Sequence, residues 1–476
     1  MCLLPDGFAR KEKCILGIVW QKPLKKWPES TMSKKPTVLV ITYYFPPSGG
    51  AGVQRVLKTV KYLPELGWKP IVLTVTETAD FPARDPSLLS EIPPEVEVHR
   101  TPIFEPYQWY RKWTGRAPNT PIDIVTNTDQ KGRSFSENIS QWIRATFFIP
   151  DARRLWQWPA VKKGMEILRS RPVDVLFSTA PPYTCHLIAR SLKQKTKLPW
   201  VADFRDSWVG WLSTPKRWFL PHWVDFRLEK SVLHQADRLI SVSQGVQLDL
   251  LSRHPEVPIS KWTIIPNGFD EEDFQGLQPK TSSQFILTYA GSLYGKRNPM
   301  ALVQAVESLL AIYPEWSSFF RLRFIGRIDP QYLEALTRLG SIFEYIPYVP
   351  HRTCLEYLCE STGLILIIDQ ASANASILTG KIYEYLAVQK PILALAPEGE
   401  ASRLIRALGA GTVVSPKDSS QIQSLLREWV EKWKKGKALP SVSKEKISQF
   451  DRKNLTQHMV HIFNALLKEK IHGKAN

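Results

Sequence analysis

The sequence has few cysteines and lacks any long apolar segment. Its five cysteines stand apart, without a C-x-x-C pair among them: Cys2, Cys14, Cys185, Cys354 and Cys359. So sparse and odd a set fits neither a disulfide framework nor a zinc cluster, and it favours a reducing compartment. The longest purely aliphatic run, residues 364–368, is far shorter than the roughly 20 residues that cross a bilayer. We therefore predict a protein that does not span a membrane.

The N-terminus also lacks a convincing secretory signal. Residues 14–20 form a short apolar stretch, but charged residues and a proline precede it and no small-residue cleavage site follows. Met32 opens a short basic lead into the apolar run Val38–Ile41. We treat residues 1–35 as an N-terminal extension, and two interpretations stay open: a native extension, or a biological start at Met32.

Acidic residues are outnumbered. Lys+Arg 63 against Asp+Glu 45 gives a formal net charge of +18 and a pI near 9.5. This balance indicates an anionic partner, either nucleic acid, a phosphorylated small molecule or an acidic membrane surface, with solubility alone as the alternative. Basic and aromatic residues are interleaved at 104–113 and 147–158, which suits a lipid headgroup interface, stacking on bases or ordinary helix packing. No nucleic-acid-binding module is recognisable, so we expect no nucleic-acid partner.

Short apolar runs alternate with helix-length segments along most of the chain. Continuous apolar runs are typical of strands buried on both faces, and this spacing predicts parallel sheets built from β-α-β units. The first set of predicted strands comprises 38–41, 71–75, 173–177, 200–202, 239–242 and 263–265. The second set comprises 285–289, 322–325, 364–368, 392–395 and 411–414. The predicted fold class is α/β, with two Rossmann-like, doubly wound parallel-sheet domains facing a cleft.

The expected domains follow from these two sets. They are an N-terminal domain at 36–272, a C-terminal domain at 280–446 and a closing helical segment at 447–476, with a polar linker around 270–284. Residues 431–446 are Lys-rich and are expected to form a loop. Because ligands bind beyond the carboxyl ends of parallel strands, the cleft between the domains is the expected site.

A glycine-rich turn follows the first predicted strand. Gly49, Gly50 and Gly52 precede a predicted helix, where backbone N–H groups and the helix dipole favour an anion. The spacing matches neither a P-loop nor a dinucleotide fingerprint. A plain tight turn is an equally good interpretation.

A second candidate anion site begins the predicted helix at 379–388. Thr379 is a plausible cap, and Gly380 and Lys381 offer N–H donors and one cation to a diphosphate. Glu384, one turn further, could accept hydrogen bonds from a ribose diol. The alternative is a solvated acid on a surface helix.

Polar residues also follow the predicted strands of the first domain. Asp203 and Asp206 flank Arg205 after an apolar strand, where a carboxylate could orient or deprotonate an acceptor hydroxyl, Asp203 being the stronger candidate. The alternative is a structural ion network that fixes the loop. His186 is a further catalytic candidate, although a lone histidine there is more often a helix-face residue. Arg327 follows another strand and is either a donor contact or a solvated surface residue.

Six blocks in order resemble the family-4 retaining glycosyltransferases of the GT-B fold, in particular bacterial enzymes of polysaccharide and cell-envelope assembly. The blocks are Ile41–Val56, Ser178–Pro182, Trp200–Trp208, Ile265–Asp270, Tyr289–Tyr294 and Thr379–Leu386 with Lys390–Leu393. The resemblance implies a nucleotide-sugar donor held mainly by the C-terminal domain and an acceptor held by the N-terminal one.

The resemblance also assigns roles to particular residues. It implies diphosphate contacts from Gly50, Gly52, Lys296 or Arg297, and Lys381, so that no metal ion or other cofactor is needed. It gives Glu384 to the donor ribose, and it places Tyr183 and Arg205 on the acceptor side. Two departures stand out: Ser376 replaces the first acid of the family's E-x7-E pattern, and the sequence Ser178–Pro182 lacks the histidine that many relatives carry there.

The function predicted from these observations is transfer of a hexose from a nucleoside diphosphate to a hydroxyl of a lipid-linked or polysaccharide acceptor, with retention. We expect a cytoplasmic enzyme in peripheral contact with the anionic inner face of the plasma membrane. The alternatives are a nucleotide-sugar epimerase of the same fold, a non-catalytic sugar-nucleotide binder, and a nucleic-acid-binding protein.

Overall fold

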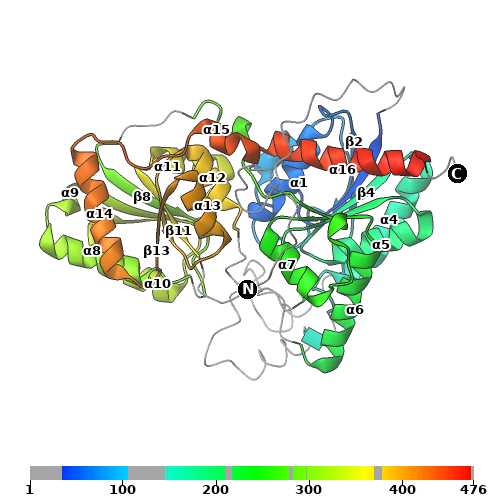
Figure 1. Cartoon of the computed structure of the whole chain (residues 1–476), viewed down its shortest axis with the longest axis horizontal. Helices are drawn as coiled ribbons and strands as arrows, with labels where there is room; N and C mark the ends of the chain where they lie inside the picture. The colour runs from blue at the N-terminus through cyan, green and yellow to red at the C-terminus, as the bar shows by residue number, and fades with distance from the viewer. Residues whose placement is uncertain are drawn as a thin grey trace, which may run out of the picture.

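The computed structural model describes residues 35–104, 145–146, 148–209, 217–277, 282–295, 297–368 and 378–472. These residues form two α/β lobes that lie side by side (Figure 1). Each lobe contains one parallel sheet with helices packed against it. The predicted fold class is confirmed.

The N-lobe is built on a seven-stranded sheet with the order β3-β2-β1-β4-β5-β6-β7. Its strands are β1 (Thr37–Ile41), β2 (Lys69–Val75), β3 (Glu97–Thr101), β4 (Val175–Ala180), β5 (Trp200–Phe204), β6 (Arg238–Ser241) and β7 (Trp262–Ile264). Its longer helices are α1 (Ala51–Tyr62), α4 (Gln157–Ser170), α5 (Thr184–Thr196), α6 (Phe219–Gln235) and α7 (Gln244–Arg253). Short 3-10 turns include η1 (Pro86–Glu91).

The C-lobe has a six-stranded sheet with the order β10-β9-β8-β11-β12-β13. Its strands are β8 (Phe285–Ala290), β9 (Phe320–Ile325), β10 (Phe343–Ile346), β11 (Gly363–Ile367), β12 (Ile392–Leu395) and β13 (Gly411–Val414). Its helices are α8 (Met300–Ile312), α9 (Trp316–Phe319), α10 (Pro330–Thr337), α11 (His351–Glu360), α12 (Lys381–Val388), α13 (Glu400–Leu408), α14 (Ser419–Lys434) and α15 (Lys444–Ile447). The lobes are connected through η4 (Glu271–Phe274).

The central strands are apolar because both of their faces are covered. In β1, Leu39 and Ile41 belong to one cluster of buried side chains, and Val38 and Val40 belong to another. Successive side chains of a strand point to opposite faces, so a strand between two helical layers has no polar side. This is why continuous apolar runs predicted these strands correctly.

Two strands were missed, and both lie at sheet edges. β3 reads Glu-Val-His-Arg-Thr and β10 reads Phe-Glu-Tyr-Ile, and most residues of each are partly exposed. An edge strand has a neighbour on one side only and tolerates polar residues. Neither segment therefore contains the apolar run on which the prediction relied.

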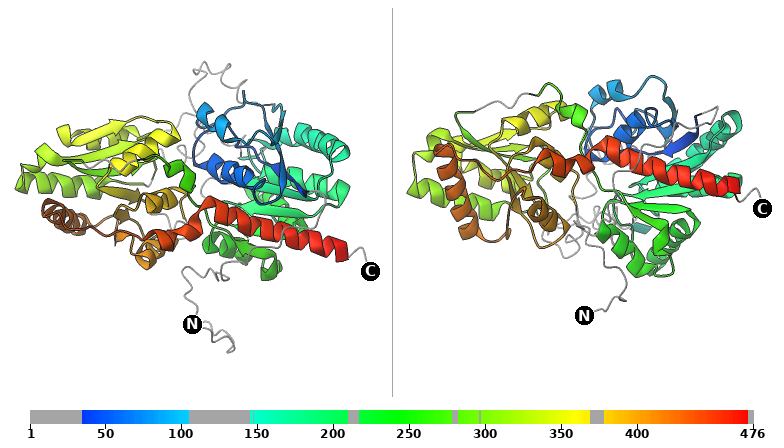
Figure 2. Two further views of the ribbon diagram at one scale, coloured as in Figure 1. Left: turned by 90° about the horizontal axis from the view of Figure 1, so that it is seen from above. Right: turned by 45° about the horizontal axis from the view of Figure 1, so that its top comes forward.

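The last helix, α16 (Arg452–His472), returns to the N-lobe (Figure 2). Leu455, Met459 and Phe463 pack in the same buried cluster as Val53 and Leu57 of α1. The expected closing helix therefore starts at Arg452, five residues after the start of the predicted segment 447–476. The expectation of a loop at 431–446 was partly wrong, because α14 continues to Lys434 and α15 begins at Lys444.

The described helices include none that combines the length and apolar character of a membrane span.

Candidate active site

A small pocket of about 10 Å³, enough for a single water molecule, lies between the lobes. Its walls come from α1, the connector at 268–274, α11, α12 and the first residue of α16. The residues that line it are Gln54, Lys58, Gly268, Phe269, Asp270, Asp273, Phe274, His351, Leu355, Glu384 and Arg452. The pocket lies in the predicted gap between the two sheets and includes Glu384.

Lys381, the first residue of α12, lies against the end of β8. Its Nζ is 4.5 Å from the centroid of the Tyr289 ring and 3.4 Å from the Tyr289 hydroxyl. Gly291 has a φ of +123°, and a Cβ placed there would lie 2.4 Å from Nζ of Lys381. The positive φ favours a glycine at this position.

A second cation and an unsatisfied hydroxyl lie near Lys381. Arg297 donates from Nη1 to the carbonyl oxygen of Ser292 at 3.1 Å and packs over the ring of Tyr294. Burial and the charge of Arg297 lower the pKa of Lys381 to about 7. The Thr379 hydroxyl is buried and has no hydrogen-bond partner among the described residues. A bound anion would satisfy the hydroxyl and offset the repulsion between the two cations.

Thr379 does not act as the predicted cap. Gly380 occupies the N-cap position of α12, and no side chain caps the helix. The amides of Ile382 and Tyr383 donate to the carbonyl oxygens of Thr379 and Gly380 at 3.2 Å, so an anion here would rely on the amides that precede them. Lys296 and Ser376 lie outside the described residues, so their predicted positions are not placed here.

Glu384 lines the cleft one turn after Lys381, as predicted. Its Oε1 lies 3.0 Å from Nε2 of His351, the first residue of α11. Burial raises the pKa of Glu384, but the hydrogen bond from His351 and the charges of His351, Arg452 and Lys381 outweigh it and lower the pKa. The carboxylate is thus ionised and held in place, and it can accept hydrogen bonds from a diol.

His351 was missed by the sequence analysis. It follows β10, so overlooking that edge strand also hid the loop at its carboxyl end. A proline directly before a helix-length segment, Pro350, was the available signal.

Arg327 follows β9 and reaches toward the N-lobe. Its Nη2 donates to the carbonyl oxygen of Pro82 at 3.3 Å. Gly326, with a φ of +115°, brings the end of β9 close to Gly291 at the end of β8. Arg327 therefore lies at the strand ends where donor contacts were expected, and it also links the two lobes.

The glycine-rich turn of the N-lobe begins α1. Gly50 is the N-cap residue, with a φ of +84° that favours glycine. The carbonyl of Gly52 accepts a hydrogen bond from Arg205. Arg205 also donates to the carbonyls of Ala180 and Pro181, so it ties three chain segments together at the carboxyl edge of the sheet.

Tyr183, predicted on the acceptor side, is engaged within the protein. Its ring stacks on Trp208 at 4.6 Å between centroids, and its hydroxyl donates to the carbonyl of Ser207. Only 4% of the residue is exposed. Tyr183 thus packs inside the N-lobe and does not present a free hydroxyl.

Asp203 does not lie open to the cleft, contrary to the prediction. It is fully buried and accepts from Nε and Nη2 of Arg55 at 2.9 and 2.7 Å, and from the Thr179 hydroxyl at 2.7 Å. Arg55 also donates to the carbonyls of Ile265 and Pro266. Burial raises the pKa of Asp203, but Arg55 outweighs it and lowers the pKa. This geometry supports the structural interpretation, with Arg55 rather than Arg205 as the partner of Asp203.

His186 is also placed away from the cleft. It is fully buried in α5, its Nδ1 lies 2.8 Å from Oγ of Ser178, and its ring packs 4.5 Å from that of Phe204. Burial lowers the pKa of His186 to about 3, so the ring is neutral. Of the three predicted catalytic residues, Asp206 alone is partly exposed, in the loop after β5.

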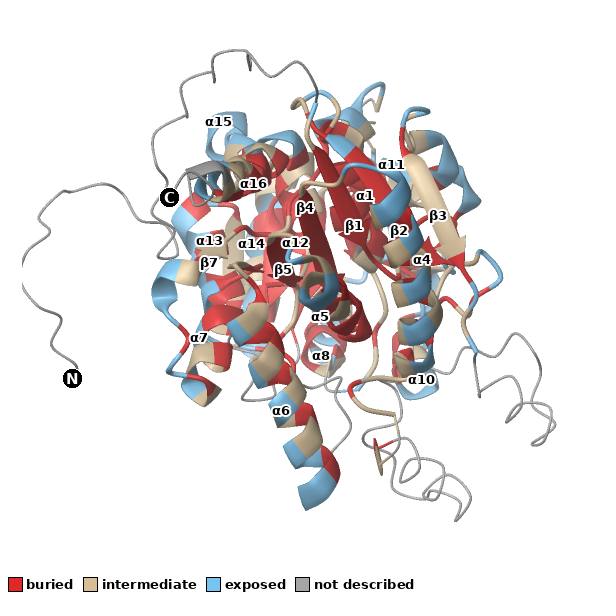
Figure 3. Cartoon of the chain, turned by 90° about the vertical axis from the view of Figure 1, so that its right-hand side faces the viewer, coloured by how far each residue is buried: buried red, intermediate tan, exposed pale blue. Residues whose placement is uncertain are grey.

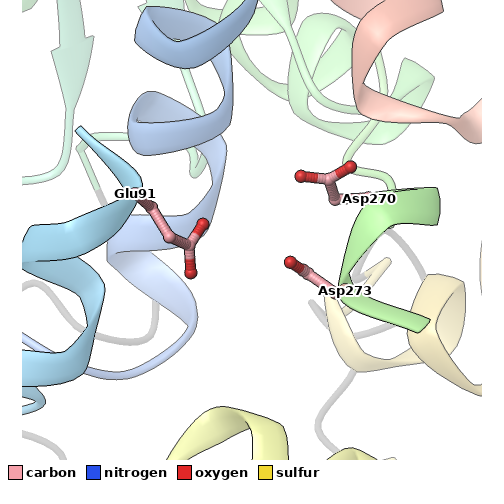
Figure 4. A group of neighbouring side chains, drawn as sticks. All are labelled: Glu91, Asp270 and Asp273. Atoms are coloured by element: carbon pink, nitrogen blue, oxygen red, sulfur yellow. The ribbon is translucent and has the colours of Figure 1, made fainter. Parts of the chain in front are cut away.

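Glu91, Asp270 and Asp273 bring three carboxylates close together beside the cleft (Figure 4). The ammonium of Lys58 lies among them, 2.5 Å from Glu91 and 2.9 Å from Asp270, and it also contacts Asp273. Lys58 is 1% exposed. A lysine cation thus occupies the position between these carboxylates and fastens α1 to the connector.

The two segments with interleaved basic and aromatic residues, 104–113 and 147–158, can be compared with the structure to different extents. Residues 105–113 lie outside the described residues. In 148–158, Trp156 is a core residue that donates to the Thr101 hydroxyl at 2.7 Å, whereas Trp158 is 75% exposed beside Lys162. Only part of this segment can face a membrane.

Two Rossmann-like lobes with a charged cleft and a helix N-terminus at the end of the C-lobe sheet define the GT-B class. Solved structures of that class superpose on about nine tenths of the chain. HepE from Anabaena, in complex with UDP and glucose, has a TM-score of 0.57 and 15% identity, covering 90% of this chain and 100% of that chain. The lipopolysaccharide outer core galactosyltransferase WaaB has a TM-score of 0.50 and 11% identity, covering 91% of this chain and 99% of that chain.

Residues 49–268 match the family model described as "Glycosyl transferase 4-like domain". No curated protein matches the sequence. The chain therefore carries a glycosyl transferase 4-like domain on a GT-B fold, and it is a glycosyltransferase, as the resemblance predicted.

Proposed function

We propose that this glycosyltransferase moves a hexose from a nucleoside diphosphate to a hydroxyl of a lipid-linked or polysaccharide acceptor, with retention. The observation that carries the proposal is the set of groups at the start of α12. Lys381 lies against Gly291, Arg297 is close enough to lower the pKa of Lys381, and the Thr379 hydroxyl lacks a hydrogen-bond partner among the described residues. Such a cluster suits a diphosphate, because amide donors and two cations can offset its charge.

The donor would lie across the cleft face of the C-lobe. The diphosphate would take the N-terminus of α12, and Glu384 would accept hydrogen bonds from the ribose diol one turn further on. The structural neighbour HepE is named in complex with UDP, which makes uridine diphosphate the first nucleotide to test. WaaB is named as a lipopolysaccharide galactosyltransferase, which supports an envelope glycan as acceptor.

In the proposed reaction, the bond between the anomeric carbon and the diphosphate oxygen breaks and a bond from the acceptor oxygen to that carbon forms. The electron pair leaves with the diphosphate, whose charge Lys381 and Arg297 stabilise. Because Asp203 and His186 are buried and engaged, we assign the acceptor proton to the departing diphosphate oxygen on the same face of the sugar. We expect no need for a metal ion, since two cations already serve this role.

A thermal-shift titration tests the donor site. UDP should raise the Tm of the full chain, because a ligand that binds only the folded state stabilises it. Lys381→Ala and Glu384→Ala should each lose most of the shift. Lys390→Ala is the matched control, since Lys390 follows the opposite end of the same helix, and its shift should remain.

Product analysis tests the reaction itself. Incubation with UDP-hexose and a lipid-linked glycan extract should transfer the sugar with an unchanged anomeric configuration and with chelator present. Conversion of the donor sugar in the absence of acceptor would instead indicate an epimerase. A full UDP response in both site variants would remove the proposed site. We also place the enzyme on the cytoplasmic face of the membrane, where nucleotide sugars are present.

A further inference from the structure

The first turn of α6 is an exposed apolar tip. We define the α6 tip as Trp218, Phe219, Leu220 and Trp223, which are 48%, 81%, 50% and 47% exposed. The opposite face of the same helix is buried through Pro221, Asp225, Glu229, Val232 and Leu233. The tip therefore belongs to the outward stripe of a packed helix.

The length of α6 explains why the tip projects. The helix has 17 residues, about 25 Å at 1.5 Å per residue, whereas the following strand β6 has only four. The C-terminus of α6 is fixed beside the start of β6, since the Asp237 amide donates to the Trp200 carbonyl. The N-terminus thus extends past the carboxyl edge of the sheet, and Figure 3 shows α6 reaching away from the body of the lobe with exposed residues at its far end.

The tip is held rigidly by buried ion pairs. Arg217, directly before it, lies 3.0 Å from Asp225, with both side chains at most 2% exposed, and donates to the Pro150 carbonyl at 2.7 Å. Trp208 donates to Asp225 at 2.8 Å, and Glu229 accepts from Arg253 at 2.9 Å. Buried charges need their partners in place, so this network fixes the direction of the helix. Four large apolar groups are thus held out toward solvent, each at least 47% exposed.

Cations follow the apolar groups along the outward stripe. Arg227 lies one turn after Trp223, with its guanidinium 5.2 Å from the Trp223 ring centroid. Lys230 follows, paired with Glu256 at 3.0 Å. From Phe219 to Arg227 the helix rises about 12 Å, close to the ~5–10 Å to which interfacial helices enter a bilayer. The apolar side chains lie at the end of the helix, and Arg227 lies further back along it. This order matches that of a lipid leaflet, in which the acyl chains lie deeper than the phosphates.

We propose that the α6 tip inserts into an anionic lipid surface and that Arg227 contacts the lipid phosphates there. The net charge of +18 adds a general attraction to such a surface. Four apolar side chains in little more than one turn are too few for a stable protein interface, which buries about 800 Å² per partner. Insertion of apolar side chains into a bilayer does not require an interface of that area.

The position of the tip deepens the proposed function, on which this step rests. The tip projects at the carboxyl edge of the N-lobe sheet, the edge that also carries Arg205, Asp206 and the start of α1. Docking here turns the acceptor side of the cleft toward the lipid. A hydroxyl on a lipid-linked acceptor then reaches the site without leaving the membrane surface.

Vesicle flotation of the full chain tests the proposal. The wild type should float with vesicles of phosphatidylcholine and phosphatidylglycerol and much less with phosphatidylcholine alone. Phe219→Ser/Trp223→Ser should lower the partition coefficient by at least about tenfold. Arg227→Ala should lower it about fivefold, only on the anionic vesicles.

The matched control is Ile259→Ser/Ile312→Ser, which removes two apolar side chains that are 61% and 58% exposed on other helices. It should float like the wild type. Equal flotation of the tip variant and wild type would overturn the proposal, and so would equal recovery on neutral and anionic vesicles. A wild-type dimer that the tip variant converts to monomer, with flotation unchanged, would identify a second copy as the occupant instead.

Failure of the docking surface and of the donor site can be told apart. The tip variant should keep the full UDP thermal shift, because its substitutions lie outside the donor site. Loss of flotation with an intact UDP shift supports the docking surface. If the wild type floats but UDP does not raise its Tm, the proposed donor site is wrong and the proposed docking surface is still supported.

Discussion

His351 Nε2 lies 3.0 Å from Glu384 Oε1, so the N-terminal residue of α11 holds the carboxylate one turn into α12. The amide of His351 also donates to Oδ2 of Asp85 in the N-lobe at 3.3 Å. One residue thus connects the opposite lobe to the carboxylate proposed to bind ribose. The arrangement positions Glu384 before any donor arrives.

Replacing His351 with glutamine should destabilise the protein at mildly acidic pH. Burial lowers the pKa of His351, but the hydrogen bond and charge of Glu384 and the charge of Asp273 outweigh it and raise the pKa. A histidine whose pKa is higher in the folded protein than in the unfolded protein stabilises the fold. This contribution is fully present below the unfolded-state pKa of about 6.5 and disappears as the pH rises through the folded-state pKa. The lowered pKa of Glu384 removes its own contribution as pH falls below about 4.3.

We therefore expect His351→Gln to lower the free energy of unfolding by about 1 kcal/mol near pH 5.5 and by less near pH 8.5. Urea unfolding at both pH values measures this. His234→Gln is the control, because His234 pairs with Glu256 in a largely exposed setting and should cost little at either pH. An identical loss at both pH values for His351→Gln would contradict the ion pair.

Donor affinity should fall as the pH rises above neutrality. Burial and Arg297 lower the pKa of Lys381 to about 7, so the free protein loses this cation above that pH. Binding of a diphosphate then requires proton uptake, and the Kd should rise up to about tenfold per pH unit. Calorimetric titration with UDP-glucose from pH 7 to 9 in buffers of different ionisation enthalpy measures both quantities. Lys381→Met should bind weakly at every pH, and a flat wild-type profile would refute this role.

Removing the Lys58 ammonium should destabilise the protein and create a cation site. Lys58→Ala leaves Glu91, Asp270 and Asp273 without the charge that now lies among them, and we expect a loss of about 3 to 5 kcal/mol. Three carboxylates with an open centre suit a hard divalent cation. Calcium should therefore raise the Tm of Lys58→Ala and not that of the wild type. The same calcium response in both proteins would contradict this account.

Asp203 and Arg55 should couple strongly in stability. Each of Asp203→Asn and Arg55→Leu leaves a buried partner unsatisfied, at a cost of about 3 to 5 kcal/mol. The double variant should lose much less than the sum of the two, as a double-mutant cycle in urea would show. If Asp203→Asn kept wild-type stability while transfer was abolished, Asp203 would have a catalytic role instead.

The local sequence was sufficient to predict the central strands and the start of α12. Val38–Ile41 and Leu364–Ile368 are apolar throughout because both faces of these strands are covered, and no other local structure explains such short runs as well. Gly380 and Lys381 were correctly placed at a helix start. The edge strands β3 and β10 were not predictable in this way. Because β10 was not predicted, the position of His351 just after it was not predicted either.

The partners of buried charges were beyond the reach of sequence reasoning. Asp203 pairs with Arg55, 148 residues away, although Arg205 is two residues from it. Lys58 contacts Asp270 and Asp273, over 200 residues further along the chain. Such pairs depend on which helix packs across which strand, and no local pattern encodes that.

The sequence alone determined that this chain forms two α/β lobes, each with a parallel sheet. It also determined that a helix starts at Lys381, on the cleft side of the C-lobe. Both follow from local rules, since burial on two faces requires apolar strands and residues 379–381 carry the signals of a helix start. Only the tertiary structure decided that Asp203 and His186 are buried, that His351 holds Glu384, and that the first turn of α6 projects from the N-lobe. Whether a polar side chain is exposed or engaged depends on groups that are distant in sequence, because burial and charge pairing are properties of the packed chain.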